Sequence, residues 1–146
     1  MSMSNASETA LLNLLFNNTD WANVGDAAGL QNSAAAGSFY VALHTADPTD
    51  AGNQTTSEAS YTGYARVAVA RTVAGWTVSG NQVSNTATVQ FGECTAGSAT
   101  VTHFSVGLLA SGAGDILYSG ALSASRAVSA GITPLFNPAT LVGTVD

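Results

Sequence analysis

The side chains best suited to chemistry in this chain are two histidines and a few carboxylates. His44 precedes Asp47 by three residues, a spacing that could serve an acid–base pair or part of a metal site. No second His, Cys or Glu follows His44 or His103 at the spacing of a metal-ligand set, and no serine occupies a G-x-S-x-G turn. We therefore expect no catalytic residue, and a hydrogen-bonded structural role for both histidines.

Other candidate ligand sites are equally sparse. Asp47 and Asp50 share one segment but lack the ligand rhythm of a calcium loop, so Asp47-Pro48 is interpreted as the start of a turn and no metal is expected. Cys94 is a single cysteine, which excludes a disulfide within the chain and favours a packing role. The glycines of residues 112–114 lie between expected strands, so they do not predict a phosphate loop or a bound cofactor.

Aromatic side chains form the remaining candidate site. They could stack on sugars, as in lectin-like sandwiches, although most should be core or interface anchors. The candidates are Tyr40, Tyr61, Tyr64, Trp76 and Tyr118.

Charge is scarce in these 146 residues. The chain has 8% charged residues and a net charge of −6, and its only cationic side chains are Arg66, Arg71 and Arg126. This acidic balance argues against direct binding of nucleic acid, and no run of apolar residues approaches the length of a membrane span. A surface with so few charges favours burial in an assembly over an ordinary Ser/Thr-rich exterior. The three arginines are candidates for ion pairs across interfaces or, alternatively, surface partners of a nearby carboxylate.

One helix is expected, close to the N-terminus. Ser4 or Ser7 can cap it, Glu8 suits the positive end of its dipole, and residues 17–20 end it. Four apolar side chains repeat at helical spacing within it, namely Leu11, Leu12, Leu15 and Phe16. A short amphipathic helix needs a surface to lie on. These four are therefore candidate interface residues that dock on a neighbour, or they pack on their own domain.

The rest of the chain is expected to be β. Phe39, Val41 and Leu43 alternate with polar or small residues, which is the two-residue period of a strand. Further strand-like runs are 63–71, 76–78, 82–84, 87–91, 101–109, 116–119, 126–128 and 141–145. Turn signals every eight to twelve residues favour an antiparallel β-sandwich or jelly roll. We expect a helix or arm over residues 1–20, a single β-sandwich domain over residues 21–146, and a loop from Asp47 to Ser60 that is exposed or between subunits.

Several short segments follow one another in an order that resembles a known family. They are Glu8–Asn13, Phe39–Pro48, Tyr61–Arg66, Val83–Ala87, Val101–Phe104, Ile116–Leu122 and Leu141–Val142. Together they resemble small virion structural proteins of tailed bacteriophages, described as tail fibre or capsid decoration proteins. The resemblance extends over nearly the whole chain from Glu8 onward.

The resemblance implies a non-enzymatic virion component, β-sandwich-like and assembled in copies. We expect a capsid decoration (cement) protein that binds the major capsid protein and copies of itself as a homotrimer, because a chain without heptads or collagen-like repeats suits a compact shell protein. The alternative is a tail, tail-tip or fibre component that contacts the host surface, with a host glycan as ligand. Residues 1–16 lack the Lys or Arg of a signal peptide, so production in the bacterial host cytoplasm is expected before incorporation into the phage particle.

Overall fold

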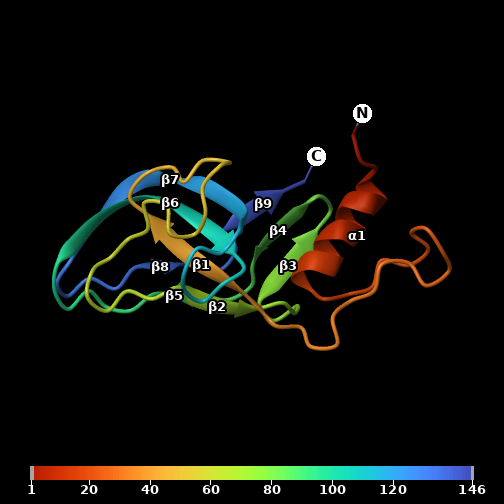
Figure 1. Cartoon of the computed structure of the whole chain (residues 1–146), viewed down its shortest axis with the longest axis horizontal. Coiled ribbons are helices and arrows are strands. Elements are labelled where there is room, and N and C mark those ends of the chain that lie inside the picture. Colours follow the sequence, from red (N-terminus) through yellow and green to blue (C-terminus); the bar gives the residue numbers. More distant parts are fainter. Residues whose placement is uncertain (1, 146) are drawn as a thin grey trace. The chain divides into compact units, whose positions relative to one another are not determined.

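A computed structural model describes residues 2–145 of the chain and is mainly β, with one short helix near the N-terminus (Figure 1). In chain order, its elements are α1 (Asn5–Phe16), β1 (Ser38–His44), β2 (Val67–Ala70), β3 (Trp76–Ser79), β4 (Gln82–Asn85), β5 (Val89–Gln90), β6 (Ser98–Gly107), β7 (Ile116–Ser129), β8 (Leu135–Phe136) and β9 (Val142–Thr144).

The strands of the described residues form three sheets. One has the order β2-β1-β6-β7, the second β3-β4-β9 and the third β5-β8. The pairings β1–β6, β6–β7, β3–β4 and β4–β9 are antiparallel. The expected class, an antiparallel sandwich-like β fold with a short N-terminal helix, is confirmed.

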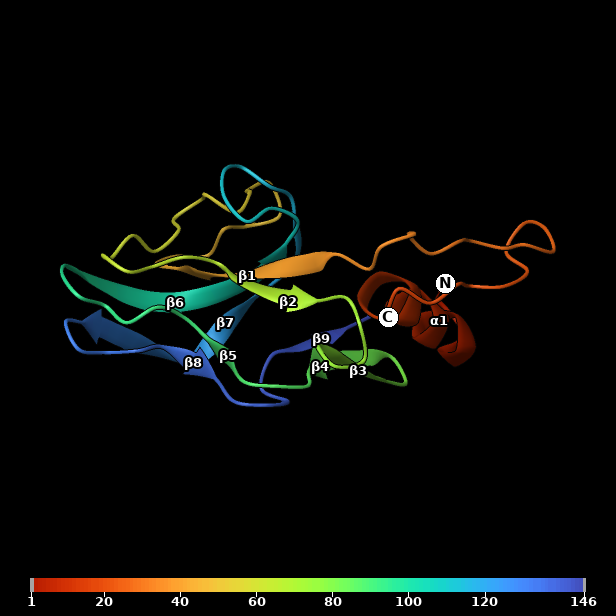
Figure 2. The same ribbon diagram turned by 90° about the horizontal axis from the view of Figure 1, so that it is seen from below.

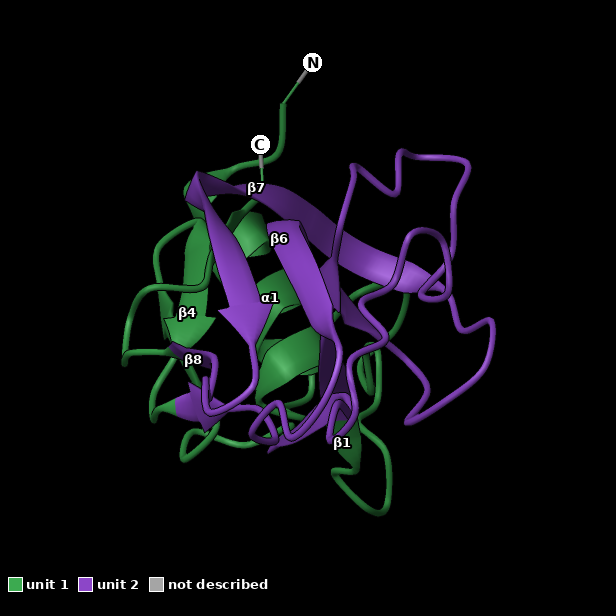
Figure 3. Ribbon diagram, turned by 90° about the vertical axis from the view of Figure 1, so that its left-hand side faces the viewer, with its two compact units in different colours: residues 1–38, 70–88, 136–146 green, residues 39–69, 89–135 purple. Residues whose placement is uncertain are grey.

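The chain divides into two compact units (Figure 3). Unit 1 comprises residues 1–38, 70–88 and 136–146, and unit 2 comprises residues 39–69 and 89–135. Each unit is thus assembled from segments that lie apart in the sequence. The expected division into an arm (1–20) and one β domain (21–146) stays a prediction.

In unit 1, helix α1 packs on the β3–β4 hairpin. Ser4 caps the helix by accepting a hydrogen bond from the Ser7 N–H, as expected from the sequence. Leu12 and Phe16 are completely or almost completely buried, and the Phe16 ring meets the Trp76 ring edge-on with centroids 4.9 Å apart. The helix therefore gains its stability from this apolar face. It is the only helix among the described residues, and it is too short to cross a membrane.

In unit 2, β1 lies in the interior of its sheet, between β2 and β6. Phe39, Val41 and Leu43 are buried core residues on one face of the strand. The opposite face of β1 is also largely covered, because Ala42 and His44 are fully buried. Covering both faces requires material beyond the sheet itself, and loop 45–66, the connection between β1 and β2, supplies part of it.

Strand β7 is the edge of this sheet and contains a bulge. Val101 of β6 lies opposite Arg126, whereas His103, two residues later, lies opposite Ala121. Residues 122–125 therefore have no partner on β6, which is the signature of a bulged strand. The sequence indicated two separate strands at 116–119 and 126–128; the structure joins them across this bulge.

Candidate functional site: a buried polar cluster beneath two loops of unit 2

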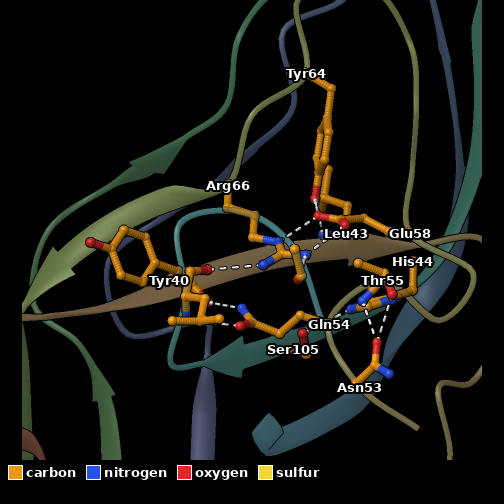
Figure 4. Close-up of polar contacts among 12 residues, drawn as sticks. Tyr40, Leu43, His44, Asn53, Gln54, Thr55, Glu58, Tyr64, Arg66 and Ser105 are labelled. Carbon is orange, nitrogen blue, oxygen red and sulfur yellow. Dashed lines mark hydrogen bonds and ion pairs between the residues drawn. The ribbon is translucent and has the colours of Figure 1, made fainter. Parts of the chain in front are cut away.

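The most elaborate arrangement of polar side chains in unit 2 centres on Arg66 (Figure 4). Its Nε donates to Glu58 Oε1 and its Nη2 donates to Glu58 Oε2, both at 2.7 Å. The two side chains are only 2% and 16% exposed, respectively. The pair is thus a two-pronged, largely desolvated ion pair within loop 45–66. The hydrogen bonds to Glu58 raise the pKa of the Arg66 guanidinium, so the arginine stays charged.

The same guanidinium fastens a second loop. Arg66 Nη1 donates to the Leu109 carbonyl at 2.9 Å, and Nη2 also donates to the Gly112 carbonyl at 2.8 Å. Both acceptors belong to loop 108–115, the connection between β6 and β7. One buried cation therefore holds two loops together.

Tyr64 ties this pair to the sheet. Its hydroxyl donates to Glu58 Oε1 at 2.9 Å and accepts from the Leu43 N–H of β1 at 3.1 Å. Burial, with the neighbouring Glu58 carboxylate, raises the pKa of the Tyr64 hydroxyl, so the phenol keeps the proton that it donates. The ring stacks against Phe91 with centroids 6.0 Å apart. Loop 45–66 is thereby attached to a core strand.

Gln54 forms the second link between the loops. Its side chain is fully buried, its Oε1 accepts from the Leu109 N–H at 2.9 Å, and its main-chain N–H donates to the Gly114 carbonyl at 2.9 Å. A Cβ at Gly107 would lie 2.3 Å from Gln54 Cδ, and one at Gly114 would lie 2.2 Å from Oε1. A side chain at either position would displace the Gln54 side chain from its hydrogen bonds.

His44 is the third buried polar anchor. Its Nδ1 lies 2.8 Å from the Thr56 carbonyl, which can only accept, so Nδ1 carries the proton. Nε2 then accepts from the Ser105 hydroxyl, also at 2.8 Å. Burial is the main cause that lowers the pKa of His44, which favours this neutral form. The expected hydrogen-bonded structural role is confirmed for His44, and His103 likewise bonds the Thr102 hydroxyl through Nδ1.

Other candidates from the sequence also have structural roles. Asp47 accepts from the Thr49 N–H, which is the expected turn. Tyr61 and Trp76 are 4% and 2% exposed, and so are core anchors, as expected of most aromatics. Cys94 is buried. Within residues 2–145, no three His, Cys, Asp or Glu side chains gather as a metal would require.

The candidate interface residues of the helix divide into two pairs. Leu12 and Phe16 pack inside unit 1, whereas Leu11 and Leu15 are half-buried. Docking of the helix on a neighbour stays a prediction.

The candidate arginines lie in different environments. Arg66 is engaged within unit 2, as described above. Arg71 donates to the Leu14 and Leu15 carbonyls at the end of α1 and to the Ala36 carbonyl. Arg126 is exposed on β7. The proposed ion pairs across interfaces stay a prediction for all three.

Sequence reasoning missed most of the cluster. It pointed to Arg66 and His44, but not to Glu58, Gln54 or Tyr64 as their neighbours. It expected the polar loop from Asp47 to Ser60 to be exposed or between subunits. Half of its residues are exposed, yet Pro48, Gln54 and Ala59 within it are buried. The only signal in the sequence was Glu58, eight residues before Arg66, and outside a helix this spacing does not predict a contact. The hydroxyl of Ser105 and the imidazole of His44 are fully buried and hydrogen-bonded to each other, and the polar groups of the cluster hold the two loops in place.

Comparison with known proteins gives a match to a family. The family of the podophage GP4 fiber I protein gp80 matches residues 2–144, which includes nearly all of both units. No curated protein matches the chain.

Proposed function

We propose that this chain, which belongs to the family of the podophage GP4 fiber I protein gp80, is a fibre component on the tail of the phage particle. Membership of that family makes it a structural protein of the bacteriophage virion, as the resemblance in the sequence implied. Its place on the tail, and contact with the host surface there, are our proposal.

The observation that carries the tail placement is the extent of the family match. Because the match runs from residue 2 to residue 144, the fibre description applies to both units and not to a shared fragment. This supports the fibre role over the capsid decoration role that the sequence led us to expect. The cluster around Arg66 supports a binding or structural task, since its polar groups hydrogen-bond one another and hold loops in place.

Immunogold labelling of intact virions tests the proposal. An antibody raised against the purified full chain is applied to whole particles, and the same antibody absorbed with the purified chain serves as the control. We expect gold at the tail and none in the absorbed control. Gold spread over the heads would overturn the tail placement in favour of capsid decoration. Gold on neither part would also overturn it.

A further inference from the structure

Two adjacent leucines are presented to solvent on loop 108–115. Leu108 and Leu109 are 42% and 48% exposed, and they are the only sequence neighbours among the large, exposed apolar residues that the structure describes. Figure 2 shows this loop (cyan) beside loop 45–66, on one side of β1 and β6. Single exposed apolar residues are common on protein surfaces, whereas an adjacent pair on a fixed loop is less common.

The backbone of this pair is held at three points. The Leu108 N–H donates to the Asp115 carbonyl at 3.1 Å, the Leu109 N–H donates to Gln54 Oε1, and the Leu109 carbonyl accepts from Arg66 Nη1. Two of these partners are buried side chains from loop 45–66. Fixing a loop in advance lowers the conformational entropy that binding would otherwise cost. The exposed leucines therefore have the rigidity of a preorganised contact.

We propose that Leu108 and Leu109 are the apolar anchors of a docking surface for a different virion protein, whose complementary site is apolar with a cationic rim. This inference rests on the proposed function, because a fibre component belongs to a particle that contains other proteins. Gln54 and Arg66 are positioning residues for this surface, because they act on it through the backbone of loop 108–115.

Charge determines the partner's chemistry. The two loops carry three exposed carboxylates, those of Asp47, Asp50 and Asp115. A cationic rim would complement them. A second copy of the chain cannot supply such a rim, because Arg66 is buried in its pair with Glu58, Arg71 is committed to main-chain carbonyls, and a lone Arg126 remains exposed. The occupant is therefore a protein of different composition, with Lys or Arg around an apolar site.

The test uses phage particles assembled without this protein, to which the purified full chain is added. Copies bound per particle are measured by quantitative immunoblot after sedimentation. We expect the double variant L108S/L109S to bind at least tenfold fewer copies than the wild type at equal concentration. The matched control is I132S/L135S, since Ile132 and Leu135 are 45% and 47% exposed elsewhere on the chain. It should bind as the wild type does. Circular dichroism and urea denaturation verify that both variants are folded.

A salt series tests the charged rim. Wild-type binding should weaken as NaCl is raised, and D47N/D50N/D115N should show a flatter dependence, because it lacks the three carboxylates. Equal binding by L108S/L109S and wild type would overturn this inference but not the proposed function. An equal loss of bound copies by the I132S/L135S control would also overturn the inference. A wild-type oligomer that L108S/L109S abolishes in light scattering would identify a second copy as the occupant and overturn it too. If the wild type binds no particles at all, the proposed function fails as well.

Discussion

At the scale of single residues, the ion pair of Arg66 and Glu58 matters to stability because removing one partner would leave the other as an unpaired buried charge. A buried pair adds little over an apolar pair of the same shape, but removing one partner leaves the other charge without solvent or counter-ion. Arg66 is the more buried of the two, and it also bonds the carbonyls of Leu109 and Gly112. Its position therefore depends on the Glu58 carboxylate.

The variant E58Q should lose about 3 kcal/mol of unfolding free energy, because it removes the negative charge opposite a buried guanidinium. Urea denaturation followed by far-ultraviolet circular dichroism, which reports on the strands of both units, measures this loss. The matched control D115N removes an exposed carboxylate and should change the free energy by less than about 0.5 kcal/mol. A loss for E58Q as small as that of the control would contradict a structural role for the pair.

His44 should make stability depend on pH. Burial lowers its pKa in the folded protein below the ordinary value of 6.5, so the unfolded chain binds the proton first as the pH falls. The stabilising contribution is complete above pH 6.5 and is lost as the pH falls from there toward the lowered pKa. The slope is at most about 1.4 kcal/mol for each pH unit. Urea denaturation between pH 7.5 and pH 5 measures it. The variant H44Q, which cannot titrate, should show a shallower fall than the wild type; parallel curves would refute the prediction.

At the scale of elements, helix α1 is completed by a distant arginine. The last carbonyls of a helix lack partners within it, and α1 has no basic residue in its last turn. Arg71 supplies both donors and positive charge to the Leu14 and Leu15 carbonyls. The helix end is thus bonded from a point just after β2 rather than from its own sequence.

The variant R71Q should therefore destabilise unit 1 by about 1.5–3 kcal/mol, the range for hydrogen bonds to charged groups. Amide hydrogen exchange should accelerate in α1 more than in β6, which belongs to unit 2. The control R126Q changes an exposed arginine and should leave both rates unaltered. Uniform acceleration in both elements would contradict this local role.

The fit of Gln54 between two glycines predicts coupling between loop and strand. The variant G107A would place a methyl group 2.3 Å from Gln54 Cδ, so it should cost about 1–3 kcal/mol and expose loop 45–66 to limited proteolysis. Adding Q54A removes the obstacle, so the double variant should be more stable than the sum of the two single changes implies. Strictly additive losses would show that the two side chains do not compete for the same space.

The elements also show how far the sequence alone could go. Helix α1, the hairpin at Trp76–Asn85 and the alternating strand at Phe39–His44 were predictable, because capping residues, turn residues and apolar periods are local signals. The joined strand β7 was not, because its unpaired residues between Ala121 and Arg126 look like a turn until β6 lies beside them. Gln54 was missed for a related reason: a polar residue in a polar loop carries no sign of burial.

At the scale of the whole molecule, the distribution of charge is uneven between interior and surface. Two of the three arginines are engaged in hydrogen bonds within the chain, so the exposed charge is predominantly carboxylate. Repulsion among carboxylates then opposes non-specific association at neutral pH. Near the isoelectric point, about pH 4.4, that repulsion disappears.

Light scattering against pH should therefore show self-association that rises toward pH 4.4 and falls on either side. Circular dichroism at each pH separates association of folded protein from unfolding. Scattering that stays flat while the protein remains folded would contradict this prediction. The variant R126Q, with one cation fewer, should shift the maximum to lower pH.

The bond between Arg71 and the end of α1 has a consequence for how the chain is made. The helix is synthesised first, yet the guanidinium that bonds its Leu15 carbonyl is encoded 56 positions later, and Trp76 of its packing surface follows that. At about 5–20 residues per second, a ribosome needs about 3–11 seconds to bridge this gap. Through that interval α1 has neither the Arg71 donors for its last carbonyls nor the Trp76 ring for its apolar face, so the helix cannot reach its final packing while it is being made.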